Sequence, residues 1–525
     1  MGGEAALRPG LRCEGLAGLS GLLLILSFPK FGHGAVAWVA LVPLLLALPG
    51  TAGWRAFRLG YITGVVSALG LLYWISLVVV QYGGIPLPVG IAIMIALCLA
   101  FALFPAVFAW VVARLVASLG TVGLLGAPVV WVATELLRAH TLFEFPWCQL
   151  GYSQYRSLPV IQIASVTAVY GVSFVLMASS ALLAFLAIER ESRRRRAAVG
   201  ALVLLVGGVW AGGAWALRQP LVETGQVRVG LVQGGIRQED KWVPGSAWDN
   251  IGRHVELTGE AAARGARLVV WPESAVPFLF DQHQTLAEAL RRMVREWDIY
   301  LFFGNDDRET EGEGRIFVGA KLLTPEGDLT LRYHKIHLVP FGEYVPMQRL
   351  FTLGGRFAAK VVQEVSDFSP GSEPAVAEVD GHLVGGYICY EAVFPGLVRR
   401  FAADGAELLI NITNDAWYGT TSAPYQHLAM AAFRAVENRR YMVRAANTGI
   451  TAVVDPWGRI LEPTRLFDRT VLVRDVPFIA EKSLYTRYGD LFARGCLAAA
   501  LALLAATLRR PGPLGPTRGD RRDRT

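Results

Sequence analysis

Three reactive side chains follow short apolar segments in the C-terminal half of this 525-residue chain. Glu273 follows Leu-Val-Val-Trp-Pro, Lys335 follows Leu-Arg-Tyr-His, and Cys389 follows Gly-Gly-Tyr-Ile. A thiol attacks carbonyls as its thiolate, so it needs a base, and a carboxylate shielded from water can take its proton. A fixed ammonium can stabilise the oxyanion that forms in the attack. Together the three residue types predict nucleophilic acyl transfer through the cysteine.

Each of these residues has an ordinary alternative when it is taken alone. A glutamate at a strand end is usually solvated, a lysine in Arg-Tyr-His-Lys is usually a surface charge, and a cysteine after an apolar strand is usually part of the core. Reactive groups in α/β domains lie just beyond strand C-termini, so we expect the three to meet. The backbone N–H of Tyr390, where a turn leads into a helix, is a candidate second oxyanion donor.

The segments that must position these residues alternate between strand and helix patterns. We expect strands at 227–233, 267–273, 300–304, 316–323, 329–334, 383–389, 408–414, 450–454 and 471–474. Helices are expected at 248–263, 286–297, 394–403 and 427–444. This alternation predicts a layered α/β domain with a core of its own.

The rest of the chain is too apolar for an ordinary cytosolic enzyme. Apolar residues make up 53% and charged residues only 18%, and the charged residues are unevenly spread. Segment 59–113 contains no Asp, Glu, Lys or Arg, and a span needs about 20 apolar residues. We therefore expect about eight spans. They are 15–29, 35–48, two within 59–113 that are separated near 81–84, 115–134, 157–188, 197–217 and 491–508.

Basic residues on alternate loops orient the chain. Arg55 and Arg58, Arg114, Arg193 to Arg196, and Arg509 flank the predicted spans, which places these loops and both termini in the cytoplasm. The resulting organisation is a bundle of seven spans over 1–217, an outer catalytic domain over 218–490, a final span over 491–508, and a cytoplasmic basic tail over 509–525. The tail is expected to be disordered.

No cofactor is expected. His334 and His337 lack companion ligands for a metal, no glycine-rich phosphate loop occurs, and a net charge of +7 does not by itself indicate nucleic-acid binding. Of the five cysteines, only Cys389 lies in the outer segment, so it has no partner there for an internal disulfide.

Longer motifs around the three residues resemble a known superfamily. Trp-Pro-Glu-Ser, His-Lys-Ile-His-Leu-Val-Pro-Phe-Gly-Glu and Ile-Cys-Tyr-Glu resemble the nitrilase superfamily, whose domain is an α-β-β-α sandwich. The segments 145–154, 337–346, 413–419 and 447–452 resemble the apolipoprotein N-acyltransferase family of Gram-negative bacteria, and this resemblance extends over nearly the whole chain. Two departures, Gly235 and the segment 315–318, bear on hydrogen bonding around the site and leave the three catalytic positions unchanged.

The resemblance implies a role for each matching residue. Cys389 corresponds to the nucleophile, Glu273 to the general base and Lys335 to the oxyanion-stabilising lysine. The supporting or substrate-binding residues would be Glu343, Tyr390, Glu391, Trp242, Asn414 and Trp417. Trp242 corresponds to an aromatic on a mobile loop, with packing on the domain surface as its alternative. Asn414, Asp415 and Trp417 would shape the wall of the site, or else form a tight structural turn.

The resemblance also implies a reaction. The sn-1 acyl group of a phospholipid, with phosphatidylethanolamine as the expected donor, would pass through a thioester on Cys389 to the N-terminal amine of a diacylated apolipoprotein. The protein would lie in the bacterial inner membrane with its catalytic domain on the periplasmic side. Apolar segments such as 350–357 would dip into the membrane interface, or alternatively pack on the domain. The rival functions are a membrane-tethered amidase and a ligand-binding receptor or transporter.

Overall fold

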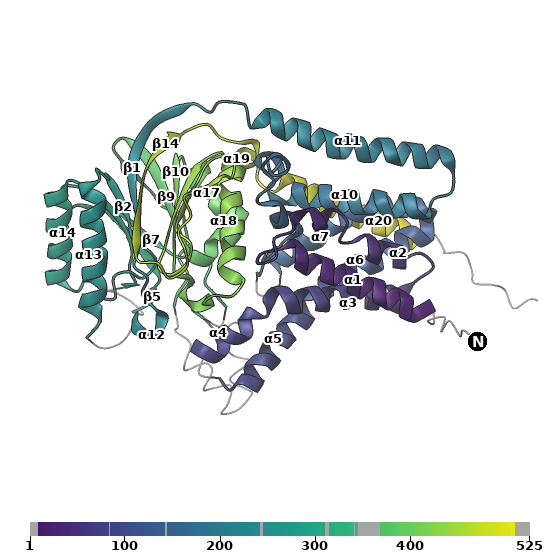
Figure 1. Cartoon of the computed structure of the whole chain (residues 1–525), viewed down its shortest axis with the longest axis horizontal. Coiled ribbons are helices and arrows are strands. Elements are labelled where there is room, and N and C mark those ends of the chain that lie inside the picture. Colours follow the sequence, from purple (N-terminus) through teal and green to yellow (C-terminus); the bar gives the residue numbers. More distant parts are fainter. Residues whose placement is uncertain are drawn as a thin grey trace, which may run out of the picture.

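The chain folds into a helical bundle and a two-sheet sandwich that lie end to end (Figure 1). The computed structural model describes residues 9–509 except 83–84, 142–143, 242–244, 310–313, 341 and 345–367. Trp242, segment 350–357 and most of the C-terminal tail therefore lie outside the described residues.

The sandwich contains two six-stranded sheets that pack face to face. The first has the order β14(Thr470–Ile479), β1(Glu223–Gln233), β2(Leu268–Val270), β3(Tyr300–Gly304), β6(Gly319–Leu323) and β7(Leu329–His334). The second has the order β13(Ile460–Leu461), β12(Ala452–Val454), β11(Tyr441–Ala446), β10(Leu408–Thr413), β9(His382–Ile388) and β8(Val376–Val379). Helices α13(Ala247–Ala263) and α14(Gln284–Trp297) cover the first sheet, and α17(Pro395–Ala403) and α18(Ala423–Asn438) cover the second (Figure 1). The predicted α-β-β-α sandwich is confirmed.

Strand register brings the ends of distant segments together. In the second sheet, β9, β10 and β11 are parallel, and Ile388 pairs with Ile412. The residues that follow β9 and β10 therefore emerge at the same edge. Gly386 faces the first sheet, where an added Cβ would lie 2.2 Å from Cζ of Phe302. Only glycine permits the sheets to approach so closely three residues before Cys389.

One helix prediction and one strand prediction are wrong in their bounds. The helix expected at 427–444 ends at Asn438, because Arg439 adopts a left-handed conformation (φ 54°), and β11 follows it. The strand expected at 316–323 is divided into β5(Ile316–Phe317), which pairs with β4(Asp307–Arg308), and β6. The structure also contains β8, which was not predicted.

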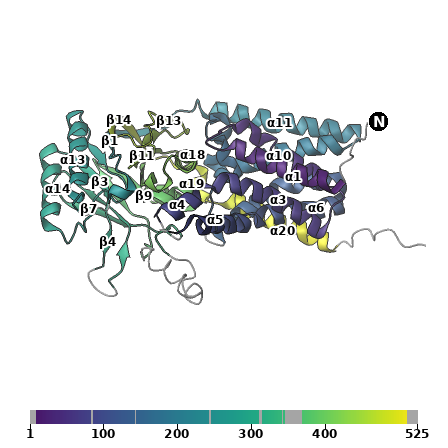
Figure 2. The same ribbon diagram turned by 60° about the horizontal axis from the view of Figure 1, so that its bottom comes forward.

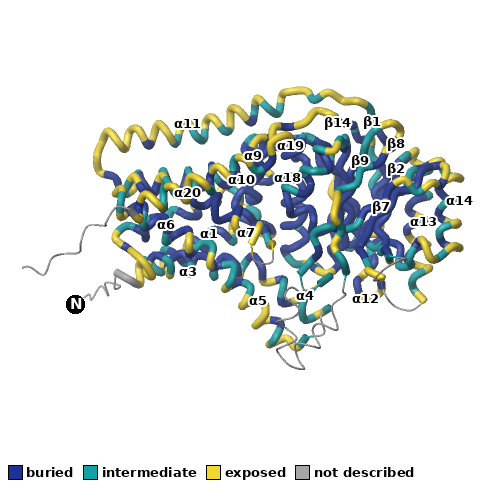
Figure 3. The backbone as a smooth tube through the Cα atoms, turned by 180° about the vertical axis from the view of Figure 1, so that it is seen from behind, coloured by how far each residue is buried: buried dark blue, intermediate teal, exposed yellow. Residues whose placement is uncertain are grey.

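The bundle is built from apolar helices. Its long members are α1(Pro9–Ser27), α3(Gly53–Leu72), α5(Leu87–Phe101), α6(Leu103–Leu119), α7(Ala127–His140), α10(Val169–Ile188), α11(Ser192–Ala216) and α20(Leu491–Arg509). Figure 3 shows α11 as the most exposed of them, lying along one side of the bundle. The beginning of α1 and the end of α20 lie at the end of the bundle away from the sandwich (Figures 1 and 2).

The expected number of spans is not confirmed. Among the described residues, four helical stretches are long and apolar enough to cross a bilayer, or five if α3 and α4(Trp74–Tyr82), bent by 50°, form one span. The segment 35–48 forms only a 3-10 turn and the six-residue helix α2(Val42–Ala47). The span expected at 115–134 is interrupted by the 3-10 turn Gly120–Gly126, where three glycines in seven residues disfavour a continuous helix.

Helix α18 joins the two parts of the molecule. Gln426 donates hydrogen bonds from Nε2 to the carbonyl oxygens of Pro29 (3.3 Å) and Leu71 (3.2 Å), at the ends of α1 and α3. Its Oε1 accepts from Nε1 of Trp147 at 2.8 Å. Further along α18, Oε1 of Glu437 accepts from the backbone N–H of Val169 at 3.0 Å. The bundle and the second sheet therefore share one helix at their boundary.

Close packing of α3 against α6 predicts the effect of adding a single methyl group. A Cβ at Gly60 would lie 2.2 Å from the carbonyl oxygen of Pro105 and 2.6 Å from Cβ of Ala109. We expect Gly60→Ala to lower the free energy of unfolding by about 1–3 kcal/mol through overpacking, measured as a lower melting temperature in detergent. Gly207→Ala is the matched control, because no atom lies within 4 Å of its added Cβ. Equal melting temperatures for the two variants would contradict this packing.

Candidate active site

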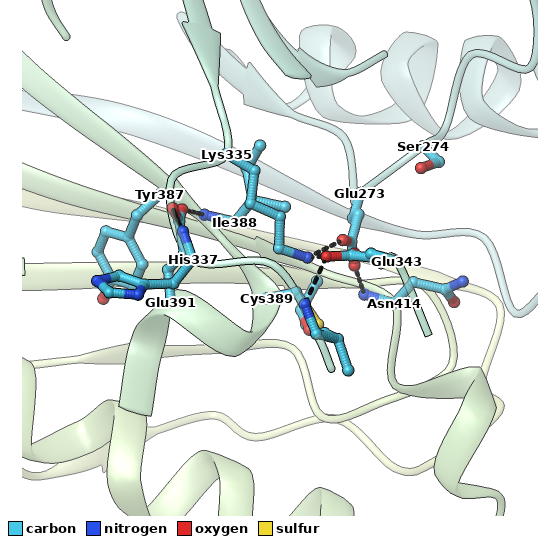
Figure 4. Close-up of polar contacts among 12 residues, drawn as sticks. Glu273, Ser274, Lys335, His337, Glu343, Tyr387, Ile388, Cys389, Glu391 and Asn414 are labelled. Atoms are coloured by element: carbon cyan, nitrogen blue, oxygen red, sulfur yellow. Dashed lines mark hydrogen bonds and ion pairs between the residues drawn. The ribbon is translucent and has the colours of Figure 1, made fainter. Parts of the chain in front are cut away.

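Three charged side chains, of which Lys335 and Glu273 are buried and Glu343 is partly buried, meet where the two sheets end (Figure 4). Nζ of Lys335, directly after β7, donates to Oε1 of Glu273 at 3.0 Å and to Oε1 of Glu343 at 2.6 Å. Lys335 is 0% exposed. Burial disfavours its ammonium, but the two carboxylates outweigh that penalty and raise the pKa of Lys335 well above its usual range. Lys335 is therefore a fixed positive charge at neutral pH.

Both oxygens of the Glu273 carboxylate are held. Oε1 accepts from Lys335, and Oε2 accepts from the backbone N–H of Asn414 at 2.8 Å. The Asn414 side chain donates to Oε1 of Gln238 (2.8 Å) and accepts from Nδ2 of Asn447 (3.0 Å). Asn414 therefore fixes the carboxylate from the first residue after β10, and Glu273 can exchange a proton without changing its orientation.

Cys389 begins the turn after β9 in a strained conformation. Its φ is +50°, which is uncommon for a residue other than glycine, and its side chain is buried. Burial raises the pKa of the Cys389 thiol, the Glu273 carboxylate raises it further, and the Lys335 ammonium opposes this. The resting sulfur therefore carries its proton, and a base must remove that proton as the sulfur attacks.

Glu391 clamps the strand ends on either side of the site. Its Oε1 accepts from the hydroxyl of Tyr333 (2.7 Å) and from the backbone N–H of Ile336 (2.6 Å), and its Oε2 accepts from the N–H of Ile388 (2.7 Å). Burial raises the pKa of Glu391 to about 7, and the hydrogen bonds act in the opposite direction. Glu391 thus ties the segment after Lys335 to the residue before Cys389 and points away from the reactive groups (Figure 4).

Glu343 and Lys241 are two further charged groups close to Glu273. The Glu343 carboxylate accepts from Lys335 and, at 2.8 Å, from the backbone N–H of Val339, and burial raises its pKa. Nζ of Lys241 donates to the Glu273 carbonyl oxygen at 3.1 Å, and burial lowers the pKa of this amine to about 8. Sequence reasoning missed Lys241, since Glu-Asp-Lys has the pattern of a solvated helix.

Aromatic rings from the segment after α7 lie against Tyr390, the residue that follows Cys389. The Tyr390 ring stacks near Phe145 (centroids 6.3 Å apart), and Phe145 stacks on Trp147 (5.7 Å). Trp417 contacts Tyr82 of α4 (4.9 Å) and is 38% exposed. A role for Trp417 in the site wall stays a prediction. In the described part of the chain, no group of three or more His, Cys, Asp or Glu side chains could hold a metal ion.

Comparison with known proteins assigns the class. Residues 228–481 match the family model described as carbon-nitrogen hydrolase, so the sandwich and its Glu, Lys and Cys side chains define a domain of that class. Residues 20–182 match the model of the apolipoprotein N-acyltransferase N-terminal domain. The solved structure of an amidase from Nesterenkonia sp. is 23% identical with a TM-score of 0.39, and the alignment covers 53% of this chain and 99% of the amidase.

Full-length relatives narrow the assignment. A protein of Geobacter metallireducens named apolipoprotein N-acyltransferase is 42% identical over 94% of this chain and 95% of its own length. A protein of Chlorobaculum tepidum with the same name is 34% identical over 94% of this chain and 96% of its own. The chain therefore belongs to the apolipoprotein N-acyltransferase family.

The clamp formed by Glu391 predicts a loss of stability on neutral substitution. In Glu391→Gln, one carboxylate oxygen becomes an NH₂ group that faces a buried N–H or O–H donor. We expect the free energy of unfolding to fall by about 1–3 kcal/mol, measured as a lower melting temperature. Glu260→Gln, on the exposed face of α13, is the control and should melt like the parent chain. A Glu391→Gln variant that melts with the control would show that the clamp does not stabilise the fold.

The raised pKa of the Cys389 thiol predicts its pH dependence. The thiolate fraction should rise roughly tenfold per pH unit between pH 7 and pH 9, because the folded-state pKa lies above this range. Iodoacetamide alkylation of the Cys389 peptide, quantified by mass spectrometry, should follow the same slope. A rate that is constant above pH 7 would contradict this and would indicate a preformed thiolate or removal of the proton by Glu273 during alkylation.

Proposed function

We propose that this chain transfers a fatty acyl group from a phospholipid to the N-terminal α-amine of a diacylated apolipoprotein, through a thioester on Cys389. The observation that carries this proposal is the Lys335 ammonium, held between Glu273 and Glu343 beside the thiol. The names of the relatives supply the class of substrate, and the apolar helices of the bundle support access to the site from a membrane.

In the first step, Glu273 takes the thiol proton as sulfur bonds to the sn-1 ester carbon. The negative charge that develops on the carbonyl oxygen faces the Lys335 ammonium. The ester C–O bond then breaks, and Glu273 returns the proton to the glycerol oxygen, so that lysophospholipid leaves. Because the buried thiol is otherwise protonated, sulfur attacks only when an ester and the base are both in place.

In the second step, the neutral amine of the lipoprotein attacks the thioester carbon. Glu273 takes a proton from the attacking nitrogen, the C–S bond breaks, and the sulfur recovers its proton. The same Lys335 charge stabilises both tetrahedral intermediates. Phosphatidylethanolamine is the proposed acyl donor, and two substrates that share one thioester give ping-pong kinetics.

The distribution of basic residues supports an inner-membrane location with the sandwich on the periplasmic side. Arg193 to Arg196 lie at the start of α11, at the end of the bundle away from the sandwich (Figure 1). Arg58, near the start of α3, pairs with Glu14, near the start of α1, which lies at the same end. Positive residues mark the cytoplasmic side, so the sandwich is assigned to the opposite side.

Mass spectrometry of the purified protein mixed with phosphatidylethanolamine tests the first step. We expect a mass increase of one fatty acyl group that Cys389→Ala abolishes, that Cys13→Ala retains, and that a diacylated peptide amine discharges. Lys335→Met should slow formation of the adduct by about 10²–10³, the usual cost of a lost oxyanion donor. Ammonia release from small amides without an acyl adduct would overturn the proposal in favour of an amidase.

A further inference from the structure

A fully buried histidine contacts the backbone of the nucleophile. Nε2 of His427, on α18, lies 3.1 Å from the carbonyl oxygen of Cys389. On the other side of the ring, Nδ1 lies 2.9 Å from Oδ1 of Asp415 and 3.1 Å from Nη2 of Arg444. All three side chains are 0% exposed. The ring is therefore fixed through both of its nitrogens.

The partner of Nε2 determines where the histidine carries hydrogen. A carbonyl oxygen only accepts hydrogen bonds, so Nε2 bears a hydrogen whether the ring is neutral or charged. Nε2–H consequently donates to the Cys389 carbonyl, and no lone pair on this nitrogen is available for the thiol proton. His427 does not serve as the base for sulfur.

The contact at Nδ1 is anchored in the interior of the second sheet. Oδ2 of Asp415 accepts from Arg444 at 2.8 Å, and Oδ1 accepts from the hydroxyl of Thr413 at 3.0 Å. Arg444, on β11, also donates to the side chain of Asn411 on β10. A continuous polar chain therefore runs from two central strands to the backbone of Cys389.

Peptide geometry links this contact to the oxyanion. The carbonyl of Cys389 and the N–H of Tyr390 belong to one planar trans peptide, so they point in opposite directions. Tyr390 is the second residue of the 3-10 helix Cys389–Val393, and its N–H has no acceptor within that helix. A hydrogen bond on the carbonyl fixes the direction of this N–H, and it also polarises the peptide and strengthens the N–H as a donor.

We propose that His427 is a positioning residue that aims the Tyr390 N–H at the developing oxyanion, opposite the Lys335 ammonium. This inference rests on the proposed function, in which Cys389 attacks an ester carbonyl. The positive φ of Cys389 persists because the backbone is held on both sides of this residue: His427 binds the carbonyl oxygen of Cys389, and Glu391 binds the N–H of Ile388, one residue earlier. Figure 4 shows the contact between Glu391 and Ile388.

Two amide substitutions of His427 test whether a hydrogen-bond donor must reach the Cys389 carbonyl. The amide nitrogen of glutamine in His427→Gln reaches about as far as Nε2 of the histidine, and His427→Asn is one methylene shorter and leaves the Cys389 carbonyl without this donor. Two rates are measured for each variant in the full-length protein. One is acyl-enzyme formation from phosphatidylethanolamine, which passes through an oxyanion, and the other is alkylation of Cys389 by iodoacetamide, which does not.

We expect His427→Asn to lower the acylation rate by about 10² and to change the alkylation rate less than threefold. His427→Gln should recover most of the acylation rate. Equal losses in both rates, or no loss in either, would overturn the inference, because the histidine would then act on the thiol, on the whole fold, or not at all.

A second variant covers the case in which His427→Asn does not fold. Asp415→Asn keeps the shape of its side chain and removes the charge that orients Arg444 beside Nδ1 of the ring, so it should show the same selective loss of acylation. An unchanged ratio of the two rates would overturn the inference. Failure of the parent chain to form any acyl adduct would instead overturn the proposed function, so the two failures are distinguishable.

Discussion

The buried ammonium of Lys335 is the interaction on which the site depends. Taking such a charge out of water costs several kcal/mol, and each carboxylate at about 3 Å returns roughly 5 kcal/mol at an effective dielectric constant of 20. Two carboxylates, from Glu273 and Glu343, therefore hold the ammonium where one would barely balance its desolvation. The same charge that stabilises the resting carboxylates is available to a transient oxyanion.

Around this ammonium, the backbone of the nucleophile is held from two directions. Glu391 ties the residue before Cys389 to the segment after Lys335, and His427 holds the peptide after Cys389 against α18. The strained turn at Cys389 is thus held by Glu391, at the end of the second sheet, and by His427, on the helix that covers this sheet. Hydrogen bonds to backbone atoms therefore fix the position of the nucleophile.

The reactive residues were predictable from the sequence because Lys335 and Cys389 stand directly after a strand and Glu273 stands three residues beyond one. Lys241 and His427 were not, because each sits in a helical segment where a polar residue is unremarkable until its distant partner is known. The helix predicted through Arg444 failed for a local reason, the left-handed turn at Arg439, which precedes a strand rich in residues that also suit helices. The number of spans was also mispredicted, because apolar composition does not show where a helix ends and several apolar segments form short or interrupted helices.

The shared helix α18 has a consequence for how the molecule could be divided. Gln426 and Glu437 satisfy backbone groups of the bundle, and Nη1 of Arg439 donates to Oε1 of Gln162 at 2.7 Å. If the sandwich were separated from the bundle, these polar atoms would lose their partners and the apolar surface around them would face water. The atoms of Gln426 and Glu437 lie on α18, the helix that also carries His427. The sandwich therefore depends on the bundle for its native structure. The helix that positions the backbone of Cys389 is itself held by hydrogen bonds to the bundle.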